Sequence, residues 1–564
     1  MSRRESWLSA GIVFAIALSI RAAAAAAVSF PVPENTAYYV GVARNLVEGR
    51  GLISDSLWSY GTQPLAVPRA AFEVWMPLPS LLAAIPMAIL GTADWFRAAQ
   101  ISSVLVSATI PVLAWRLAAD VAAEISMPTS RARTLAVGTG LVTAVLGPLV
   151  MFGAVPDSTA VFAALSLAAC VLMTRIAAPA APAAAAPPPV PPPAPVAAAA
   201  PPQVPARTAA LVALGLILGL AALTRSEAIW LAAAWAAMAW FWTPGDRRSR
   251  ARLIAVPAVV ACLVFVPWLV RDTLAFGNPL PGQTISNAFF THDYDVFAYQ
   301  NQPSLSGYLS QGWPTIFGQH VAGFTHDLFN VLLVPAFPVS LVGLLALALV
   351  WRRRSLRPLA IAAGLTYVAT SLFFPIATTS GTFLHAAGAT YVLLAVSCLV
   401  ALDALVVRIG RIRHWTRPVA WIGPGIAIAA IVPLCLVSVS TLARQGDDAR
   451  TRYDALPTAM ARAGVPLAGA GPVISSSPIW LAESARVRTL ALPEESPESV
   501  LALAHRFGAT IVIVRDDDRP WPGVLREGGS GASCFREVVL TDNSDTNVQA
   551  GSPLAGIHVF RIVC

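Results

Sequence analysis

The sequence predicts a mainly α-helical, polytopic membrane protein with a small α/β domain at its C-terminal end. Hydrophobic residues make up 56% of its 564 residues and charged residues only 12%, which leaves too little polar surface for a water-soluble protein of this length. Apolar runs long enough to cross a bilayer recur up to residue 442, and the composition then becomes that of a water-soluble domain. We therefore expect a transmembrane domain over 1–442 and a separate domain over 443–564.

We expect about eleven membrane spans, because a span needs about 17 to 25 apolar residues. The expected spans are 8–28, 98–118, 134–152, 158–174, 209–223, 229–242, 253–270, 328–350, 359–376, 384–407 and 419–442. The apolar piece at 77–90 is too short to cross and holds three prolines, so we expect a re-entrant or interfacial helix there. With this arrangement most arginine-rich loops share the cytoplasmic side, and the odd number of spans places the C-terminal domain outside.

The formal net charge of +8 comes mostly from arginines in short loops between the apolar runs. This distribution indicates membrane topology rather than a nucleic-acid surface, since no basic stripe has interleaved aromatic residues. We therefore expect the protein to be a multi-pass protein of the cell membrane with no nucleic-acid partner.

Three longer segments lie between the apolar runs. An outer loop at 29–97 follows the first span. The Pro/Ala tract at 178–206 has no apolar periodicity and is expected to be a cytoplasmic linker. The outer loop at 271–327 is rich in aromatic residues, Asn, Gln and Gly, and its length and composition indicate an ordered, functional loop.

Strand-like and helix-like pieces alternate in the last part of the chain, which predicts a small α/β domain. The strand-like pieces are 472–477, 486–492, 510–514, 536–540 and 557–563, and the helix-like pieces are 477–485 and 496–508. No dinucleotide or P-loop fingerprint is present, and we expect the acids from Asp516 to Asp518 to form a solvated turn. Cys534 and Cys564 can form a disulfide if this domain faces an oxidising compartment.

The N-terminus also fits a signal peptide, because Arg3 and Arg4 precede an apolar core and an alanine run. We favour a retained first span, since cleavage would remove the helix that holds the following loop at the membrane.

One acid stands where the first span emerges. Glu34 lies beyond Arg21 and just before Tyr38 and Tyr39. Charge is rare in this half of the chain, so a carboxylate at the membrane face is a candidate proton acceptor. The alternative is a structural role for Glu34 in the first turn of a helix, where the helix dipole favours an acid.

Further polar residues stand at the outer ends of the spans, which suggests a polar cavity on that side. They are Asp157, Arg225, Glu227, Arg271 and His385. Arg225 is the preferred ligand for a phosphate, because the planar guanidinium matches phosphate oxygens, and its alternative is a salt bridge with Glu227 or Asp157.

Three of the candidate residues also have structural interpretations. His385 could be a packed, hydrogen-bonded histidine rather than a ligand. Arg21 could extend to the lipid headgroups instead of binding substrate. Glu73 is a candidate for contact with substrate or with a metal ion.

These residues form an ordered set of motifs over most of the chain up to Val407. The motifs are R-x(12)-E-x(3)-YY from Arg21 to Tyr39 with Gly49 and Gly51 after it, the proline-bearing segment that ends at Gly91, PDS at Asp157, GLAALTRSE at Arg225, and VPWLVRDTLAFGNPL around Arg271. Together they resemble the GT-C superfamily of polytopic glycosyltransferases, which includes protein O-mannosyltransferases and the aminoarabinose transferases that act on lipid A.

The resemblance implies transfer of a sugar from a polyprenyl-phosphate donor to a hydroxyl group of a lipid, protein or glycan acceptor, usually with inversion. Glu34 matches the acid of the first outer loop, Asp157 the acid that opens a later span, and Arg225 and Arg271 the basic positions near the donor phosphate. Many relatives have two adjacent acids where this chain has Glu34 and Asn35, so the requirement for a divalent metal stays open.

We expect Glu34 to act as the base and the other candidates to bind substrate. The expected substrate-binding residues are Arg21, Tyr38, Tyr39, Glu73, Asp157, Arg225, Glu227, Arg271 and His385. A transporter or flippase of a lipid-linked saccharide is the main alternative, and a non-catalytic scaffold is a third. The absence of a visible repeat between the two halves, and the concentration of charge at one face, disfavour a transporter.

Overall fold

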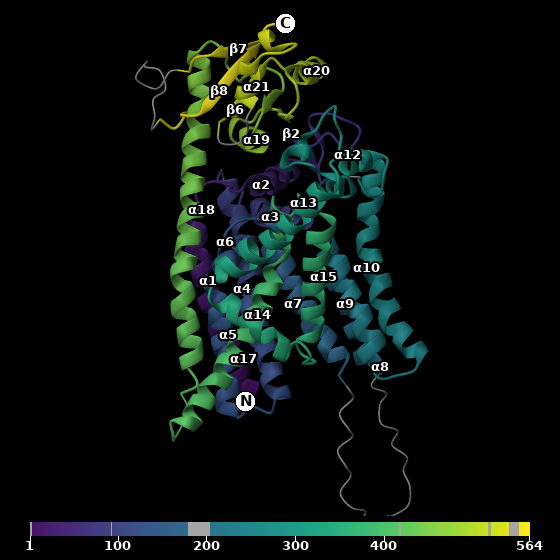
Figure 1. The fold of residues 1–564 in the computed structure, drawn as a ribbon, viewed down its shortest axis with the longest axis vertical. Coiled ribbons are helices and arrows are strands. Elements are labelled where there is room, and N and C mark those ends of the chain that lie inside the picture. The colour runs from purple at the N-terminus through teal and green to yellow at the C-terminus, as the bar shows by residue number, and fades with distance from the viewer. Residues whose placement is uncertain are drawn as a thin grey trace, which may run out of the picture.

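The computed structural model describes residues 3–91, 93–178, 204–281, 283–416, 419–516, 521–540 and 552–564. Most of the predicted linker at 178–206 lies outside these ranges, as do Asp517 and Asp518 of the predicted turn. The described chain is mainly helical, as the sequence predicted. Its helices form a bundle, with the N-terminus near one end and the C-terminal domain at the other (Figure 1).

The bundle is built from helices of very different length. They are α1 (Arg3–Ala27), α4 (Trp95–Glu124), α5 (Thr129–Ala144), α6 (Gly147–Met151), α7 (Ser158–Ile176), α8 (Val204–Ala222), α9 (Ala228–Ala237), η1 (Met238–Trp242), α10 (Arg247–Phe276), α13 (Trp313–His326), η4 (Asp327–Leu333), η5 (Val334–Ala336), α14 (Val339–Val350), α15 (Arg357–Phe373), α16 (Thr382–Ala386), α17 (Gly388–Ile412) and α18 (Ile422–Arg462).

Within the described residues, six of these helices are long and apolar enough to cross a membrane: α1, α4, α7, α10, α17 and α18. A seventh crossing results if the bent pair 313–336 and Val339–Val350 counts as one broken span. The expected number of about eleven spans is therefore not confirmed. The two short spans expected at 209–223 and 229–242 correspond to the apolar pieces Arg207–Ala222 of α8 and Ala228–Trp242 of α9 and η1, each shorter than 18 residues.

The prediction of one continuous span at 328–350 is wrong. The chain bends by 113° between the segment that ends at Ala336 and helix α14, which begins after Pro338. Proline has no backbone N–H group to continue the helical hydrogen-bond pattern, so the helix is interrupted here.

Aspartate side chains start three of the long helices. Asp94 accepts a hydrogen bond from the backbone N–H of Arg97, Asp157 from that of Thr159, and Asp246 from that of Ser249. Each carboxylate satisfies an N–H group that has no partner within its own helix. These three aspartates therefore determine where α4, α7 and α10 begin. Asp157 is held at the start of α7 by its own capping hydrogen bond.

Close packing in the bundle depends on small residues. A Cβ atom added to Gly343 of α14 would lie 2.1 Å from the backbone oxygen of Leu394 in α17. Only glycine permits this approach, and such contacts are typical of membrane helices.

The segments outside the bundle are ordered. The first outer loop contains α2 (Glu34–Val47), β1 (Ile53–Ser54), β2 (Ser56–Leu57), β3 (Arg69–Ala70) and α3 (Leu78–Leu90). The second contains α11 (Gln283–Ser286), η2 (Asn287–Phe289), η3 (Asp293–Phe297) and α12 (Leu305–Ser310). The short helix expected at 77–90 is present as α3, and the order expected for 271–327 is also present in its described residues.

Helix α18 runs along one side of the bundle and continues to the C-terminal domain (Figure 1). It is one helix of 41 residues, so the chain is still helical where we expected the domain to begin, at residue 443. The domain contains β4 (Val473–Ser475), β5 (Thr489–Ala491), β6 (Ile511–Arg515), β7 (Phe535–Val538) and β8 (Ile557–Ile562), with α19 (Pro478–Ala485), α20 (Pro497–Phe507) and α21 (Trp521–Glu527). All five predicted strands and both predicted helices are therefore present.

The sheet of this domain has six strands in the order β2-β5-β4-β6-β8-β7. Strands β4, β5 and β6 pair in parallel, whereas β8 pairs antiparallel with β6 and β7. The edge strand β2 comes from the first outer loop and pairs in parallel with β5. A disulfide joins Cys534 to Cys564. The sequence did not predict β2, because a strand of two residues has no measurable periodicity.

Candidate functional site

A cavity of about 800 Å³ lies where the outer segments meet the bundle. Its walls come from the start of α2, the segment before α3, the turn between α8 and α9, the second outer loop, and the segment between α15 and α16. Several of the predicted site residues line it: Glu34, Tyr39, Arg225, Glu227 and His385. The structure therefore brings together residues that are far apart in the sequence.

Glu34 is the first residue of α2 and lines the cavity. Its Oε1 atom accepts a hydrogen bond of 2.9 Å from the backbone N–H of Ile479, in the first turn of α19. An acid at the start of a helix is stabilised by the helix dipole, so the structural alternative for Glu34 is compatible with a role in the site.

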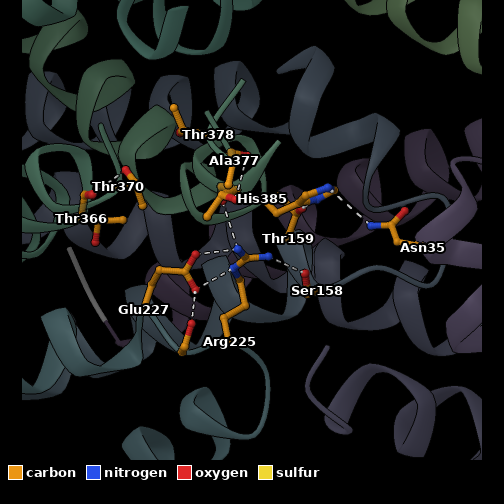
Figure 2. A network of polar contacts seen from close by, with 12 residues as sticks. Asn35, Ser158, Thr159, Arg225, Glu227, Thr366, Thr370, Ala377, Thr378 and His385 are labelled. Carbon is orange, nitrogen blue, oxygen red and sulfur yellow. Dashed lines mark hydrogen bonds and ion pairs between the residues drawn. The ribbon is translucent and has the colours of Figure 1, made fainter. Parts of the chain in front are cut away.

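Asp157 and His385 lie together and contact Asn35, the residue that follows Glu34 (Figure 2 shows the surrounding network). His385 Nδ1 is 3.3 Å from Asp157 Oδ1 and 2.8 Å from Thr159 Oγ1. Asn35 Nδ2 donates to Asp157 Oδ2 at 2.8 Å and is 3.4 Å from His385 Nε2. Asp157 is only 1% exposed, so its carboxylate contacts neighbouring side chains rather than solvent. Sequence reasoning identified Asp157 and His385 but assigned no role to Asn35, because an amide beside an acid carries no signal of its own.

Arg225 forms a two-point ion pair with Glu227, with distances of 2.6 and 3.1 Å (Figure 2). It also donates to Ser158 Oγ at 3.1 Å and to the backbone oxygen of Thr382 at 3.0 Å. The salt bridge with Glu227 that the sequence left as an alternative is thus present. These four hydrogen bonds fix the guanidinium at the cavity wall. The group is planar and rigid, so it cannot rotate when several of its N–H groups are hydrogen-bonded.

Tyr39 and Tyr38 are neighbours on α2 but contact different groups. Tyr39 lines the cavity and hydrogen-bonds to Ser158, and burial raises the pKa of its phenol. Tyr38 is 3% exposed, and its hydroxyl accepts a hydrogen bond of 2.6 Å from the backbone N–H of Phe72. Burial, reinforced by the nearby Glu73, raises the pKa of Tyr38.

A second group of charges lies outside the cavity lining. Glu73 is 3.4 Å from Arg69, and Arg271 is 2.8 Å from Asp272. The Arg271 guanidinium stacks over Trp268, with 4.8 Å to the ring centroid, and burial raises the pKa of Glu73. We call this group the closed cluster: Tyr38, Arg69, Glu73, Arg271 and Asp272. The corresponding open cluster is Glu34, Asn35, Asp157, Arg225, Glu227 and His385.

Arg21 belongs to neither cluster. Its side chain is fully buried in the bundle and donates to the backbone oxygens of Ala17 and Ala144, at 3.4 and 3.3 Å. Ala144 is the last residue of α5, so Arg21 binds a carbonyl oxygen that has no partner within that helix. This position differs from both interpretations that the sequence offered, which were substrate contact and extension to the headgroups.

No group of three or more His, Cys, Asp or Glu side chains in the described part of the chain is arranged to hold a metal ion. The open cluster pairs Asp157 with only one further ligand of these types, His385.

No protein-family model and no curated protein matches this chain.

Its fold is nevertheless similar to solved structures of membrane glycosyltransferases. ArnT from Cupriavidus metallidurans in the apo state is 14% identical over 100% of this chain and 99% of that chain, with a TM-score of 0.51. The same protein bound to undecaprenyl phosphate is 14% identical over 99% and 98%, with a TM-score of 0.51. The Archaeoglobus fulgidus oligosaccharyltransferase in complex with Zn and sulfate is 13% identical over 98% of this chain and 75% of that chain, with a TM-score of 0.55. The chain thus has the fold of the polytopic GT-C glycosyltransferases, as the resemblance predicted.

Proposed function

We propose that this protein is a membrane glycosyltransferase that moves a sugar from a polyprenyl-phosphate donor to an acceptor hydroxyl group. The single observation that carries the proposal is the cavity, which brings Glu34, the Asp157–His385 pair and Arg225 together at one end of the bundle. The structure of ArnT with undecaprenyl phosphate supports a polyprenyl carrier for the donor.

In the proposed reaction Glu34 takes the proton from the acceptor hydroxyl as that oxygen forms a bond to the anomeric carbon. The bond between the anomeric carbon and the phosphate oxygen breaks, and polyprenyl phosphate leaves with the electron pair. Attack from the face opposite the phosphate inverts the anomeric configuration. Arg225 stabilises the negative charge that develops on the leaving phosphate.

We also propose that the cavity and the C-terminal domain lie on the extracytoplasmic side of the cell membrane. Two features support this orientation. The domain holds the Cys534–Cys564 disulfide, which requires an oxidising compartment, and the N-terminus lies at the other end of the bundle (Figure 1).

The test uses the full-length protein in vesicles with a panel of radiolabelled polyprenyl-phosphate sugars. Glu34→Gln removes the base while keeping the size of the side chain, so we expect kcat to fall about 100- to 10,000-fold with donor binding retained. Asp94→Asn is the matched control, because asparagine still caps α4 and Asp94 does not line the cavity.

A carrier would give a different result. If no donor is consumed but the labelled lipid changes leaflet, and Glu34→Gln leaves that movement intact, the protein is a flippase and the proposal is wrong.

A further inference from the structure

The C-terminal domain contacts the first outer loop at several points beside Glu34. Besides the Ile479 N–H bond to Glu34, the indole N–H of Trp480 donates to the backbone oxygen of Pro31 at 2.9 Å. Strand β2 pairs with β5, and the N–H of Thr489 donates to the backbone oxygen of Asp55 at 3.0 Å. The domain is therefore attached to the segment on both sides of α2.

A buried ion pair joins α2 to α19. Arg44 donates to Glu483, and their side chains are only 4% and 12% exposed. Glu48 lies near both Arg44, at 3.9 Å, and Arg486, at 3.6 Å. A Cβ added to Gly41 would lie 3.0 Å from Glu483 Oε2, so the small residue leaves room for the carboxylate.

The two contacts act on opposite ends of α2. Glu34 stands at its first residue and Arg44 near its last, roughly 15 Å apart along the helix axis. Because both partners belong to α19, the position of that helix sets both the tilt of α2 and the direction of the Glu34 carboxylate. Removing the charge from one partner of a buried pair leaves the other uncompensated, which loosens such an attachment.

The same domain holds the second outer loop. The Glu495 carboxylate accepts hydrogen bonds from the backbone N–H groups of Tyr299, Gln300 and Asn301, at 2.8, 2.9 and 3.0 Å. Ser499 Oγ is 2.8 Å from Gln300 Oε1. These residues directly follow η3, whose side chains line the cavity.

We propose that the C-terminal domain is part of the catalytic unit, with Glu483 and Glu495 as its positioning residues. Through Arg44, Glu483 holds α19 against α2 and so keeps the Ile479 N–H on Glu34. Glu495 holds the segment after η3, whose residues form another part of the cavity wall. This inference rests on the proposed function, since it assigns Glu34 the role of base.

Kinetics test the consequence for the site in the full-length protein. Glu483→Gln should lower kcat per donor-binding site about tenfold and leave the KM for the donor within about twofold, because the base is misplaced while the cavity remains. Glu495→Gln should instead raise the KM for donor or acceptor several-fold with little change in kcat. Glu537→Gln, an exposed carboxylate of the same domain, is the control. A merely structural role would reduce the number of donor-binding sites and leave kcat per site unchanged, which would overturn the proposal.

Hydrogen exchange tests the contact without any need for activity. In Glu483→Gln we expect faster amide exchange over 478–485 and 34–47, and in Glu495→Gln faster exchange over 299–301. Unchanged exchange in both variants overturns the proposal even if the wild type transfers sugar. If the wild type consumes no donor, the proposed function fails separately, and the exchange result still decides whether the domain holds α2.

Discussion

Two clusters of charged residues lie at the end of the bundle that meets the C-terminal domain, and only one of them lines the cavity. Both contain an arginine paired with a neighbouring carboxylate: Arg225 with Glu227 in the open cluster, and Arg271 with Asp272 in the closed cluster. Two consecutive residues of α2 have different surroundings: Tyr39 lines the cavity, whereas Tyr38 does not. The difference is that Arg225 and Glu227 line the cavity whereas Arg271 and Asp272 do not, although the Arg271 side chain is the more exposed of the two arginines, at 22% against 13%.

Aromatic rings cover the closed cluster. Arg271 lies over Trp268 and over Phe276, with 4.8 and 5.4 Å to the ring centroids. Arg69 also lies 5.6 Å from the centroid of the Phe276 ring. The cavity beside the open cluster is lined by aromatic side chains such as Trp75 and Trp230 and by the segment of small residues 379–382. Similar residue types can therefore pack against aromatic rings in one place and line a cavity in another.

Replacing Asp157 by Asn should have the largest effect on the open cluster. Asparagine still caps α7 and still accepts from Thr159, but it removes the negative charge beside His385. We expect kcat to fall about 100-fold or more with the unfolding temperature nearly unchanged, because Asp157 contacts His385, which lines the cavity where the proposed transition state forms. Steady-state kinetics and thermal unfolding measure the two effects. A decrease in kcat of less than about threefold would show that the open cluster is no more important for catalysis than the closed cluster.

Replacing the two paired arginines by lysine compares the clusters directly. Arg225→Lys loses the two-point pair and cannot replace all four hydrogen bonds, so kcat/KM for the donor should fall about 10- to 100-fold. Arg271→Lys should mainly lower the unfolding temperature, since it loses the stacking on Trp268 away from the cavity. Equal losses of donor kinetics in both variants would show that Arg271 also meets the donor phosphate, as the sequence motif suggested.

The closed cluster should also give a pH signature in stability. Burial raises the pKa of Glu73 in the folded protein above its value in the unfolded chain. The folded state therefore holds this proton to higher pH, so the contribution of Glu73 to stability is greatest below the unfolded pKa and is lost as the pH rises through the folded pKa. Glu73→Gln has no such titration. We expect the variant to gain in unfolding temperature relative to the wild type as the pH rises, and a difference that is constant with pH would contradict this assignment.

Helices and strands that have a clear local sequence pattern could be predicted from the sequence alone. The alternation of strand-like and helix-like pieces predicted all five strands of the C-terminal domain, and apolar length predicted α1 and α4. The interruption at Pro338 was missed, because an apolar run with a proline inside it has the same composition as a kinked span. Of the five polar residues expected on one face, the structure brings Arg225, Glu227 and His385 into the cavity lining with Asp157 in contact with His385, whereas Arg271 lies outside that lining.

The rest of the site depends on contacts between distant segments. Glu34 and Ile479 are separated by 445 positions in the sequence, and the contact uses a backbone N–H that any residue except proline could supply. No residue pattern can therefore indicate it. Similarly, Arg21 and Glu73 are charged residues of the kind expected in a site, but the structure buries both outside the cavity lining, and Arg271 also lies outside that lining.

The smallest expected effects separate the two tyrosines of α2. In Tyr38→Phe the buried N–H of Phe72 loses its acceptor, at a residue whose φ of 74° is already unfavourable for a side chain with a Cβ. We expect a loss of about 1–3 kcal/mol in the free energy of unfolding, with kcat per folded molecule unchanged. Tyr39→Phe removes a hydroxyl that bonds to Ser158 beside Arg225, so it should lower kcat/KM only a few-fold and cost about 1 kcal/mol or less of stability. Denaturant unfolding and donor kinetics on the two variants measure both quantities. If Tyr38→Phe altered kinetics more than Tyr39→Phe, the two sides of α2 would not be functionally distinct, and the closed cluster would have to be counted as part of the site.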